Sequence, residues 1–221
     1  MPDVGWYAPV DWSARQRAAQ QHERSIFPWA RRAVIGFGVV SVLNLLVELA
    51  TTHRWADYFH AIRVIFDNRG RYSTTVPRPP SPVSGWSALI VLAEIVVGVV
   101  YLIWQYRAAT TARELGYPAK HSPGWGVAAW IVPVVNFWMP YQAVRECLPA
   151  EHSTRPLVAR AWAIYIATLV IGVTVGPLLA EVHTVGVVVV VAQSALFIWL
   201  VVTTLRVVWA INEDHARVTE G

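Results

Sequence analysis

The stretch Ser122-Pro-Gly-Trp-Gly-Val-Ala-Ala-Trp-Ile-Val-Pro-Val-Val-Asn-Phe-Trp-Met-Pro140 governs how this chain folds. It is apolar enough for a membrane, yet proline lacks a backbone N–H donor and its ring clashes with the carbonyl of the preceding turn. We therefore predict a kinked or broken helix, whose freed carbonyls need partners inside the protein if the segment lies in hydrocarbon. The residues of this helix-breaking motif are Pro123, Gly124, Trp125, Pro133 and Pro140.

The composition of the 221-residue chain is that of an integral membrane protein. Apolar residues make up 55% of the chain and charged residues only 14%, and several uncharged runs approach the length that crosses a bilayer. Many of the 12 tryptophans fall near the ends of apolar runs, where an amphipathic ring favours the headgroup level. We expect a protein of the cell membrane, with the lipid bilayer as a partner.

Several function classes find no support in the sequence. The formal net charge is +4, and the basic residues are spread over the loops, so we expect no nucleic-acid partner. The single cysteine, Cys147, excludes an internal disulfide. The seven histidines lack metal-ligand spacing, and no nucleophile elbow or phosphate-binding glycine loop occurs. We therefore expect no metal, no cofactor and no catalytic residue.

Five apolar runs define a membrane domain over residues 33–210. Four are predicted transmembrane helices, at about residues 33–50, 86–106, 161–180 and 184–205. The fifth, residues 125–148, is the proline-broken segment. Residues 1–32 read as a polar cytoplasmic tail, residues 53–67 as an external amphipathic helix, and residues 211–221 as a polar C-terminal tail.

The predicted fold class is an all-α polytopic membrane bundle with a cytoplasmic N-terminus. If all five runs cross, the cytoplasmic side carries 8 Lys and Arg residues and the outside 10, which violates the positive-inside bias. If the proline-broken segment re-enters, the count becomes 13 inside against 5 outside. A segment of 24 residues can still span as a kinked helix, so both alternatives stay open.

The ordered motifs around the proline-broken segment resemble those of a known family. They are Trp104-Gln-Tyr-Arg107, Ser122-Pro-Gly-Trp125, Pro133-Val-Val-Asn136 and Pro140-Tyr-Gln142. The chain is similar to an actinobacterial family of multi-pass membrane proteins catalogued as domain of unknown function 4328. Members often carry an asparagine where this chain has Thr110 and Thr111. The resemblance implies a polytopic membrane fold, and it implies no activity.

Polar residues within the apolar runs are the candidates for chemistry, because such residues are costly in a membrane. A buried carboxyl at Glu94 is suited to carry a proton or bind a cation, or else it serves as a polar contact between helices. Asn136 either lines a pocket beside the proline breaks or satisfies the carbonyls that they free. The candidate intramembrane polar site comprises Asn44, Glu94, Asn136 and Gln193.

These features favour a non-enzymatic scaffold or accessory subunit. Other membrane proteins or a second copy of the chain are then its expected partners, and the small-residue pair Gly172 and Gly176 offers a helix-packing face. The alternative is a small permease or ion-coupled carrier that uses a broken-helix site. The carrier requires Glu94, Asn136 and Gln193 to converge on one interior, whereas the scaffold does not.

Overall fold

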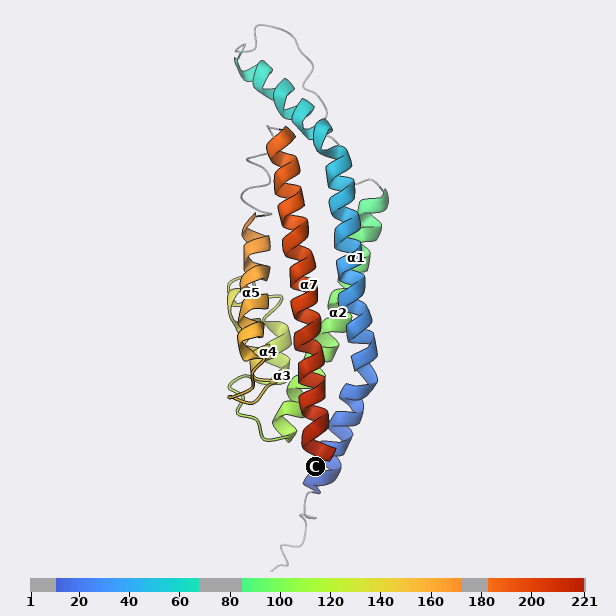
Figure 1. The fold of residues 1–221 in the computed structure, drawn as a ribbon, viewed down its shortest axis with the longest axis vertical. Coiled ribbons are helices and arrows are strands. Elements are labelled where there is room, and N and C mark those ends of the chain that lie inside the picture. Colours follow the sequence, from blue (N-terminus) through green and yellow to red (C-terminus); the bar gives the residue numbers. More distant parts are fainter. Residues whose placement is uncertain (1–10, 68–84, 172–182, 221) are drawn as a thin grey trace, which may run out of the picture. The chain divides into compact units, whose positions relative to one another are not determined.

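The protein is built from α-helices. The structure, a computed structural model, describes residues 11–67, 85–171 and 183–220, and within these ranges it contains no β-strand (Figure 1). The all-α prediction is therefore confirmed for the described residues. The predicted small-residue pair, Gly172 and Gly176, lies outside them.

Within the described ranges, four long helices and three short ones follow each other along the chain. The long helices are α1 (Trp12–Asp67), α2 (Gly85–Glu114), α5 (Arg155–Val170) and α7 (His183–Glu220). Between α2 and α5 lie the short elements α3 (Pro123–Ala128), η1 (Val135–Phe137) and α4 (Met139–Arg145). The proline-broken segment is thus a series of one- and two-turn helices joined by turns.

Three of the described helices are long and apolar enough to cross a membrane. They contain the stretches Trp12–Asn44, Ala88–Glu114 and Val187–Val218. The prediction of four spanning helices is corrected to three, because the described part of α5 has only 16 residues. A bilayer-spanning helix needs about 20 residues, since each adds about 1.5 Å along the axis. Residues 172–180 of the fourth predicted span lie outside the described ranges.

The N-terminal region differs from the predicted polar tail. Helix α1 begins at Trp12 and continues through residues 53–67, so the predicted tail and the predicted external helix both contribute to one helix. Asp11 caps its start by accepting a hydrogen bond from the Ala14 N–H at 3.0 Å. Gln20 and Glu23 are buried. Some polar side chains of residues 12–32 therefore make specific contacts inside the protein.

The chain divides into two compact units. Unit 1 comprises residues 1–33, 99–159 and 205–221, and unit 2 comprises residues 34–98 and 160–204. The sequence predicted one membrane domain flanked by two tails, whereas unit 1 joins both terminal regions to the central loops. Side-chain contacts that bring distant segments together make this unit, and the hydropathy pattern does not predict them.

The core of unit 1 gathers around one face of α2. Trp104, Ala108 and Ala112 recur every fourth residue, so they form a stripe on one side of the helix. The two alanines let neighbouring chain segments approach closely, and Trp104 fills the remaining space. Helices α1, α4, α5 and α7 and the residues after α4 supply the rest of the core, namely Ala30, Val144, Cys147, Leu148, Val158, Val207, Val208 and Ile211.

A glycine ends α2 and turns the chain toward α3. Gly116 has a φ of +82°, a left-handed conformation that glycine adopts at little cost. The Gly116 N–H bonds the Arg113 carbonyl, and the Tyr117 N–H bonds the Ala112 carbonyl, both at 2.9 Å. This pattern is a Schellman C-cap. It directs Tyr117 into the core of unit 1.

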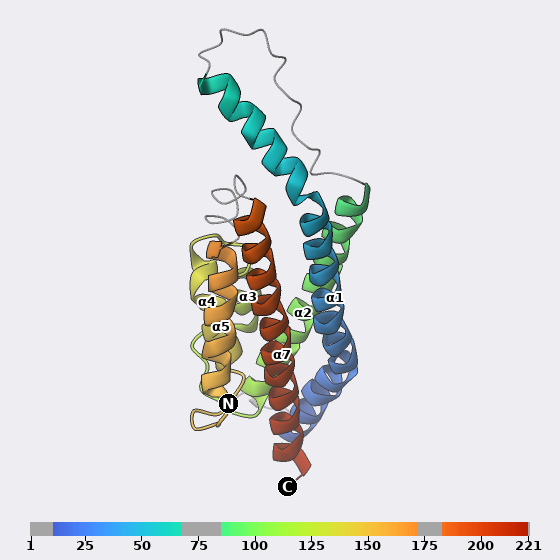
Figure 2. The ribbon, with the colours of Figure 1, turned by 45° about the horizontal axis from the view of Figure 1, so that its top comes forward.

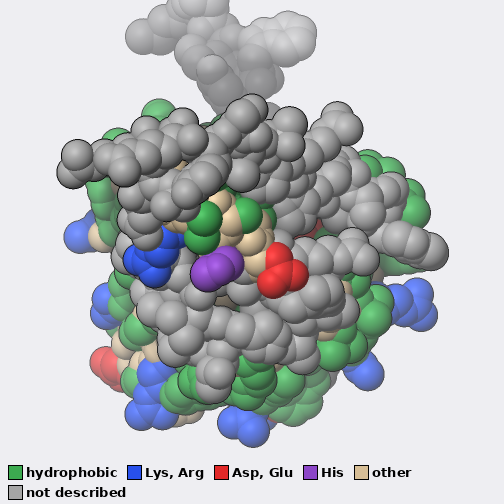
Figure 3. Space-filling model, turned by 90° about the horizontal axis from the view of Figure 1, so that it is seen from above, with side chains coloured by type: hydrophobic (Ala, Val, Ile, Leu, Met, Phe, Trp, Pro, Cys, Tyr) green, Lys and Arg blue, Asp and Glu red, His purple; other side chains and the backbone are tan. Residues whose placement is uncertain are grey.

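Unit 2 carries apolar side chains on its outside. On α2, the side chains of Leu92, Ile95 and Val96 are between 56% and 58% exposed. Where helices meet, the packing is close: the rings of Phe37 and Phe197 are 5.9 Å apart. Hydrophobic side chains also occupy much of the described surface seen in Figure 3, with Lys and Arg at its edges. A surface of this kind suits a lipid environment.

Candidate functional site

The predicted intramembrane polar site is divided between the two units. Asn44, Glu94 and Gln193 lie in unit 2 on α1, α2 and α7, and each side chain is half-buried. Asn136 lies in unit 1, within η1. The convergence of these four residues on one interior stays a prediction.

Asn136 occupies the middle of the proline-broken segment. Its backbone N–H donates to the Val132 carbonyl at 2.8 Å. Its side-chain oxygen Oδ1 is buried without a hydrogen-bond partner among the described residues. A buried unsatisfied polar atom costs about 1–3 kcal/mol, so this amide is a place where a water molecule or another polar group would bind favourably.

The three prolines of the helix-breaking motif lie at helix starts and in a turn. Pro123 occupies the first turn of α3, where Ser122 caps the helix by accepting from the Trp125 N–H at 3.2 Å. Pro140 occupies the first turn of α4. Both positions are favourable for proline, because the first N–H groups of a helix have no intrahelical acceptor. Pro133 lies in the turn between α3 and η1.

A cluster of buried and half-buried polar side chains joins the N-terminal part of α1 to the C-terminal part of α7. We call it the polar junction, and it comprises Gln20, Glu23, Tyr117, His152, Asp214 and His215. At its centre, His215 Nδ1 lies 2.8 Å from Glu23 Oε2, and both side chains are only 2% exposed. His215 Nε2 lies 2.9 Å from the Cys147 carbonyl oxygen. Gln20 donates to the His215 carbonyl from the preceding turn of α1.

The contacts of His215 specify how many protons the centre holds. A carbonyl oxygen only accepts hydrogen bonds, so Nε2 carries a proton. Nδ1 faces a carboxylate oxygen, so a second proton lies between Nδ1 and Glu23 Oε2. The pair is therefore either imidazolium with carboxylate or neutral imidazole with carboxylic acid. The other carboxyl oxygen, Oε1, is buried without a partner among the described residues.

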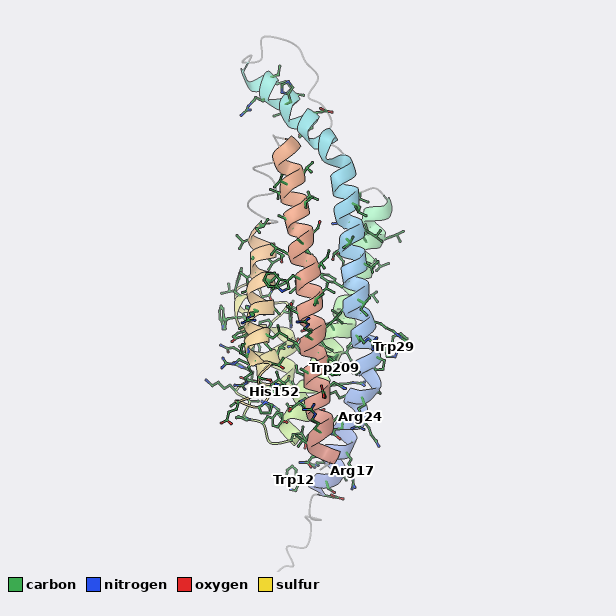
Figure 4. The ribbon with its side chains drawn as sticks, viewed as in Figure 1. Trp12, Arg17, Arg24, Trp29, His152 and Trp209 are labelled. Carbon is green, nitrogen blue, oxygen red and sulfur yellow. The ribbon has the colours of Figure 1, made fainter. Side chains whose placement is uncertain are left out.

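Tyr117 and His152 extend the polar junction through Asp214, which precedes His215 on α7. The Tyr117 hydroxyl donates to Asp214 Oδ2 at 2.8 Å, and His152 Nε2 lies 3.7 Å from Asp214 Oδ1. Burial, followed by the bond to Asp214, raises the pKa of the Tyr117 hydroxyl. Figure 4 labels His152 beside the C-terminal part of α7. The loop after α2 and the loop before α5 are thus both bound to α7.

A second polar contact holds the proline-broken segment against α2. The Gln105 amide is 1% exposed. Its Nε2 donates to the Gly126 carbonyl at 3.2 Å, and its Oε1 accepts from the Trp130 indole N–H at 2.8 Å. The Trp130 ring also meets the Tyr101 ring edge-on, at 5.9 Å between centroids. One glutamine thereby satisfies two polar groups that the broken helix leaves inside the protein.

Helices α3 and α4 approach each other closely. A Cβ atom placed on Gly126 would lie 2.9 Å from the Ala143 Cβ, which is closer than two carbon atoms allow. Gly126 is therefore a glycine because α4 leaves no room for a side chain. Figure 2 shows α3 and α4 in the same part of unit 1.

The two ends of the proline-broken segment are bound to each other. His121 Nδ1 lies 3.2 Å from Glu146 Oε1, and the His121 N–H donates to Glu146 Oε2 at 3.3 Å. Arg113, in the last turn of α2, donates to the His121 carbonyl at 2.6 Å. Within the described ranges, no three His, Cys, Asp or Glu residues are arranged to hold a metal ion.

Comparison with known families agrees with the motifs around these contacts. The model of a family described as Domain of unknown function (DUF4328) matches residues 81–213, which is more than half of the chain. The chain belongs to this family. No curated protein and no solved structure shows significant similarity to it. The resemblance proposed from the sequence is thereby confirmed at the level of the family.

The family region contains the proline-broken segment and its contacts with α2. Gln105, Gly126, Trp130, His121 and Glu146 all lie within residues 81–213. The centre of the polar junction lies outside it, because Glu23 precedes the region and His215 follows it. The family description gives no activity, so any function has to be inferred from the structure.

Sequence reasoning did not identify the polar junction. Gln16, Gln20 and Glu23 follow one another at spacings of four and three residues, which places them on one face of α1. Gln16 donates to the Glu114 carbonyl at 2.7 Å, and the other two bind His215. The signal was a polar stripe on a helix, whereas searches for amphipathic helices look for apolar stripes.

Proposed function

We propose that the protein is a multi-pass integral membrane protein with a cytoplasmic N-terminus, acting as a non-enzymatic scaffold or accessory subunit. The main support for this topology is that the ends of three helices, α1, α2 and α7, are hydrogen-bonded to each other in unit 1. Gln16 of α1 binds the last residue of α2, and Glu23 of α1 binds His215 of α7. Helix ends that are hydrogen-bonded to each other lie on one side of a bilayer.

The distribution of charge supports the cytoplasmic assignment of the helix ends that meet in unit 1. Of the 18 Lys and Arg residues, 12 belong to unit 1, and basic residues accumulate on the cytoplasmic side of membrane proteins. Figure 4 labels Trp29, Arg24 and Arg17 on the N-terminal part of α1. Trp29 is 57% exposed, and Arg32 lies over its ring at 5.3 Å. This combination is typical of the headgroup level.

The outward apolar face of α2 supports the scaffold role. Between Leu89 and Val99 five large side chains are more than half exposed, namely Leu89, Val91, Leu92, Ile95 and Val96. Such a face is suited to lipid or to a transmembrane helix of a partner, either another membrane protein or a second copy of the chain. The family resemblance also leads us to expect an actinobacterial source, which is compatible with this proposal.

Site-specific photocrosslinking in native membranes tests the scaffold. A photoreactive amino acid replaces Leu92 or Ile95 on α2. The matched lipid-facing control is the same replacement at Val188 on α7, which is 62% exposed. If the protein is a scaffold, at least one of the two α2 positions should give a crosslinked protein adduct of one discrete mass. If α2 and α7 both yield only lipid adducts, the scaffold proposal is wrong.

A specific feature of unit 2 favours the carrier as a second candidate. Glu94 is half-buried although its neighbours Ile95 and Val96 are more than half exposed, and Asn44 and Gln193 of the same unit are half-buried too. A carrier loads a proton or cation on such a carboxyl. In proteoliposomes with an internal pH dye, Glu94→Gln should abolish flux and Glu213→Gln should preserve it. Equal flux in both variants excludes this role.

A further inference from the structure

The apolar residues between His121 and Glu146 form a closed hairpin. We use the term hairpin for residues 122–145, which contain α3, η1 and α4. The side chain and the backbone N–H of His121 both bind Glu146, so the two ends of the hairpin lie at one place. Gly126 packs against Ala143 just inside that clasp. A chain segment that leaves and returns at one point does not cross a membrane.

The hairpin extends along α2 toward its apolar half. At the base, Arg113 binds the His121 carbonyl. Farther on, Gln105 binds Gly126 and Trp130, and Tyr101 meets the Trp130 ring. Arg113 and Tyr101 are 12 positions apart, which corresponds to about 18 Å along a helix axis. The tip of the hairpin therefore lies beside a part of α2 that can cross a membrane.

The tip presents apolar side chains outward. Ile131 is 78% exposed, Val134 67% and Phe137 57%. No Asp, Glu, Lys or Arg occurs between His121 and Arg145. Trp125 and Trp138 flank the tip and are about half exposed, which suits rings at the level of the lipid headgroups. The uncharged tip suits the acyl-chain layer of one leaflet, and the tryptophans on its two sides suit the headgroup layer of that leaflet.

Six backbone N–H groups on the two sides of the tip meet the requirement that hydrocarbon imposes. Polar backbone groups in lipid need partners within the protein. The N–H groups of Ala129, Trp130 and Ile131 bind carbonyls three or four residues earlier, and those of Asn136, Phe137 and Trp138 do the same. Pro123, Pro133 and Pro140 have no N–H to satisfy. The prolines thus turn the chain while removing donors that lipid would leave unpaired.

We infer that the hairpin is a re-entrant element that enters one leaflet of the bilayer from the side on which His121 and Glu146 lie. Its occupant is lipid: the acyl chains cover Ile131, Val134 and Phe137, and the headgroups meet Trp125 and Trp138. The inference rests on the proposed membrane integration and adds the location of this segment. It also places Lys120 and Glu151 on one side of the membrane.

Collision accessibility of a spin label in reconstituted vesicles tests the inference. In a Cys147→Ala background, single cysteines replace Ile131 and Val134 at the tip, Lys120 and Glu151 near the base, and Val191 within α7 as the reference for lipid. Each is labelled with a nitroxide in vesicles of phosphatidylcholine and phosphatidylglycerol. Oxygen, which partitions into lipid, and a water-soluble nickel chelate report the depth of each label.

The expected result is that Ile131 and Val134 collide more with oxygen than with the chelate, as Val191 does. Lys120 and Glu151 should collide more with the chelate and react with an impermeant thiol reagent from the same side. Chelate access at Ile131, protection of Ile131 from both reagents, or labelling of Lys120 and Glu151 from opposite sides would each overturn the hairpin. If Val191 is also accessible to the chelate, membrane integration has failed instead.

Discussion

His215 Nδ1 lies 2.8 Å from Glu23 Oε2, although 192 positions separate the two residues in the chain. Both are almost fully buried. The contact joins the C-terminal part of α7 to the N-terminal part of α1. Stability and topology both depend on this pair.

Removal of one member of the pair should destabilise the protein strongly. We expect His215→Ala to lower the free energy of unfolding by about 3–5 kcal/mol, because Glu23 would be left buried without its partner. Glu23→Gln keeps a hydrogen-bonding group and should cost less. Thermal unfolding in detergent measures both variants. The control is Glu213→Gln, which removes an exposed helix-surface pair and should change stability by less than about 1 kcal/mol.

A double-mutant cycle separates the pair from its surroundings. If His215 and Glu23 interact directly, the loss in the double variant should be smaller than the sum of the two single losses by about 0.5–3 kcal/mol. Additive losses would show that each residue contributes independently and that the observed contact is not energetically important.

Gly126 should not tolerate a methyl group. Gly126→Ala would place a Cβ 2.9 Å from the Ala143 Cβ, and overpacking of this kind costs about 1–3 kcal/mol. Gly124→Ala is the matched control, because no atom lies within 4 Å of its added Cβ. Thermal unfolding should therefore distinguish two glycines two positions apart. A second substitution, Ala143→Gly, should restore part of the stability lost in Gly126→Ala, and a failure to do so would argue against the close α3 and α4 packing.

Gln105 should be required for its two hydrogen bonds. Gln105→Leu keeps the volume but removes both hydrogen bonds, and a buried polar group left without a partner costs about 1–3 kcal/mol. Trp130→Phe removes only one donor and should cost less. Gln21→Leu, on an exposed position of α1, serves as the control. Equal unfolding temperatures for Gln105→Leu and Gln21→Leu would contradict this role.

The protein should lose stability in alkaline solution. Burial raises the pKa of the Cys147 thiol, and burial with the bond to Asp214 raises that of Tyr117. In the unfolded chain these groups lose protons near pH 8.5 and pH 10. Above those values the unfolded state binds fewer protons than the folded state, so stability falls as pH rises. The unfolding temperature should therefore decline as the pH rises above about 8.

The variant Cys147→Ala separates the two contributions to this decline. It removes the thiol, so the fall in unfolding temperature should begin closer to pH 10, where Tyr117 titrates in the unfolded chain. The shape of the pH profile is the relevant measurement, because the smaller side chain also lowers stability at every pH. A profile that starts to fall at the same pH in both proteins would show that Cys147 does not contribute.

The helical class, the family and the position of the broken segment were predictable because each depends on local properties. An apolar run of about 20 residues forms a helix in a membrane whatever surrounds it, and proline breaks a helix through its own covalent structure. The spans within α1, α2 and α7 were therefore found from hydropathy. The fourth span was not obtained, since α5 is described over only 16 residues.

The polar junction and the clasp at the hairpin base depend on contacts between residues far apart in the chain. His215 and Glu23 look like ordinary residues of polar ends, and His121 and Glu146 look like loop residues, because nothing nearby in the sequence identifies their partners. A hydrogen bond is set by distance and direction in space, which hydropathy and spacing do not encode. Local covalent structure and hydropathy determine where most helices form and where proline interrupts them. Only the tertiary structure determines which helix ends meet and on which side of α2 the hairpin lies, because these depend on contacts between distant residues.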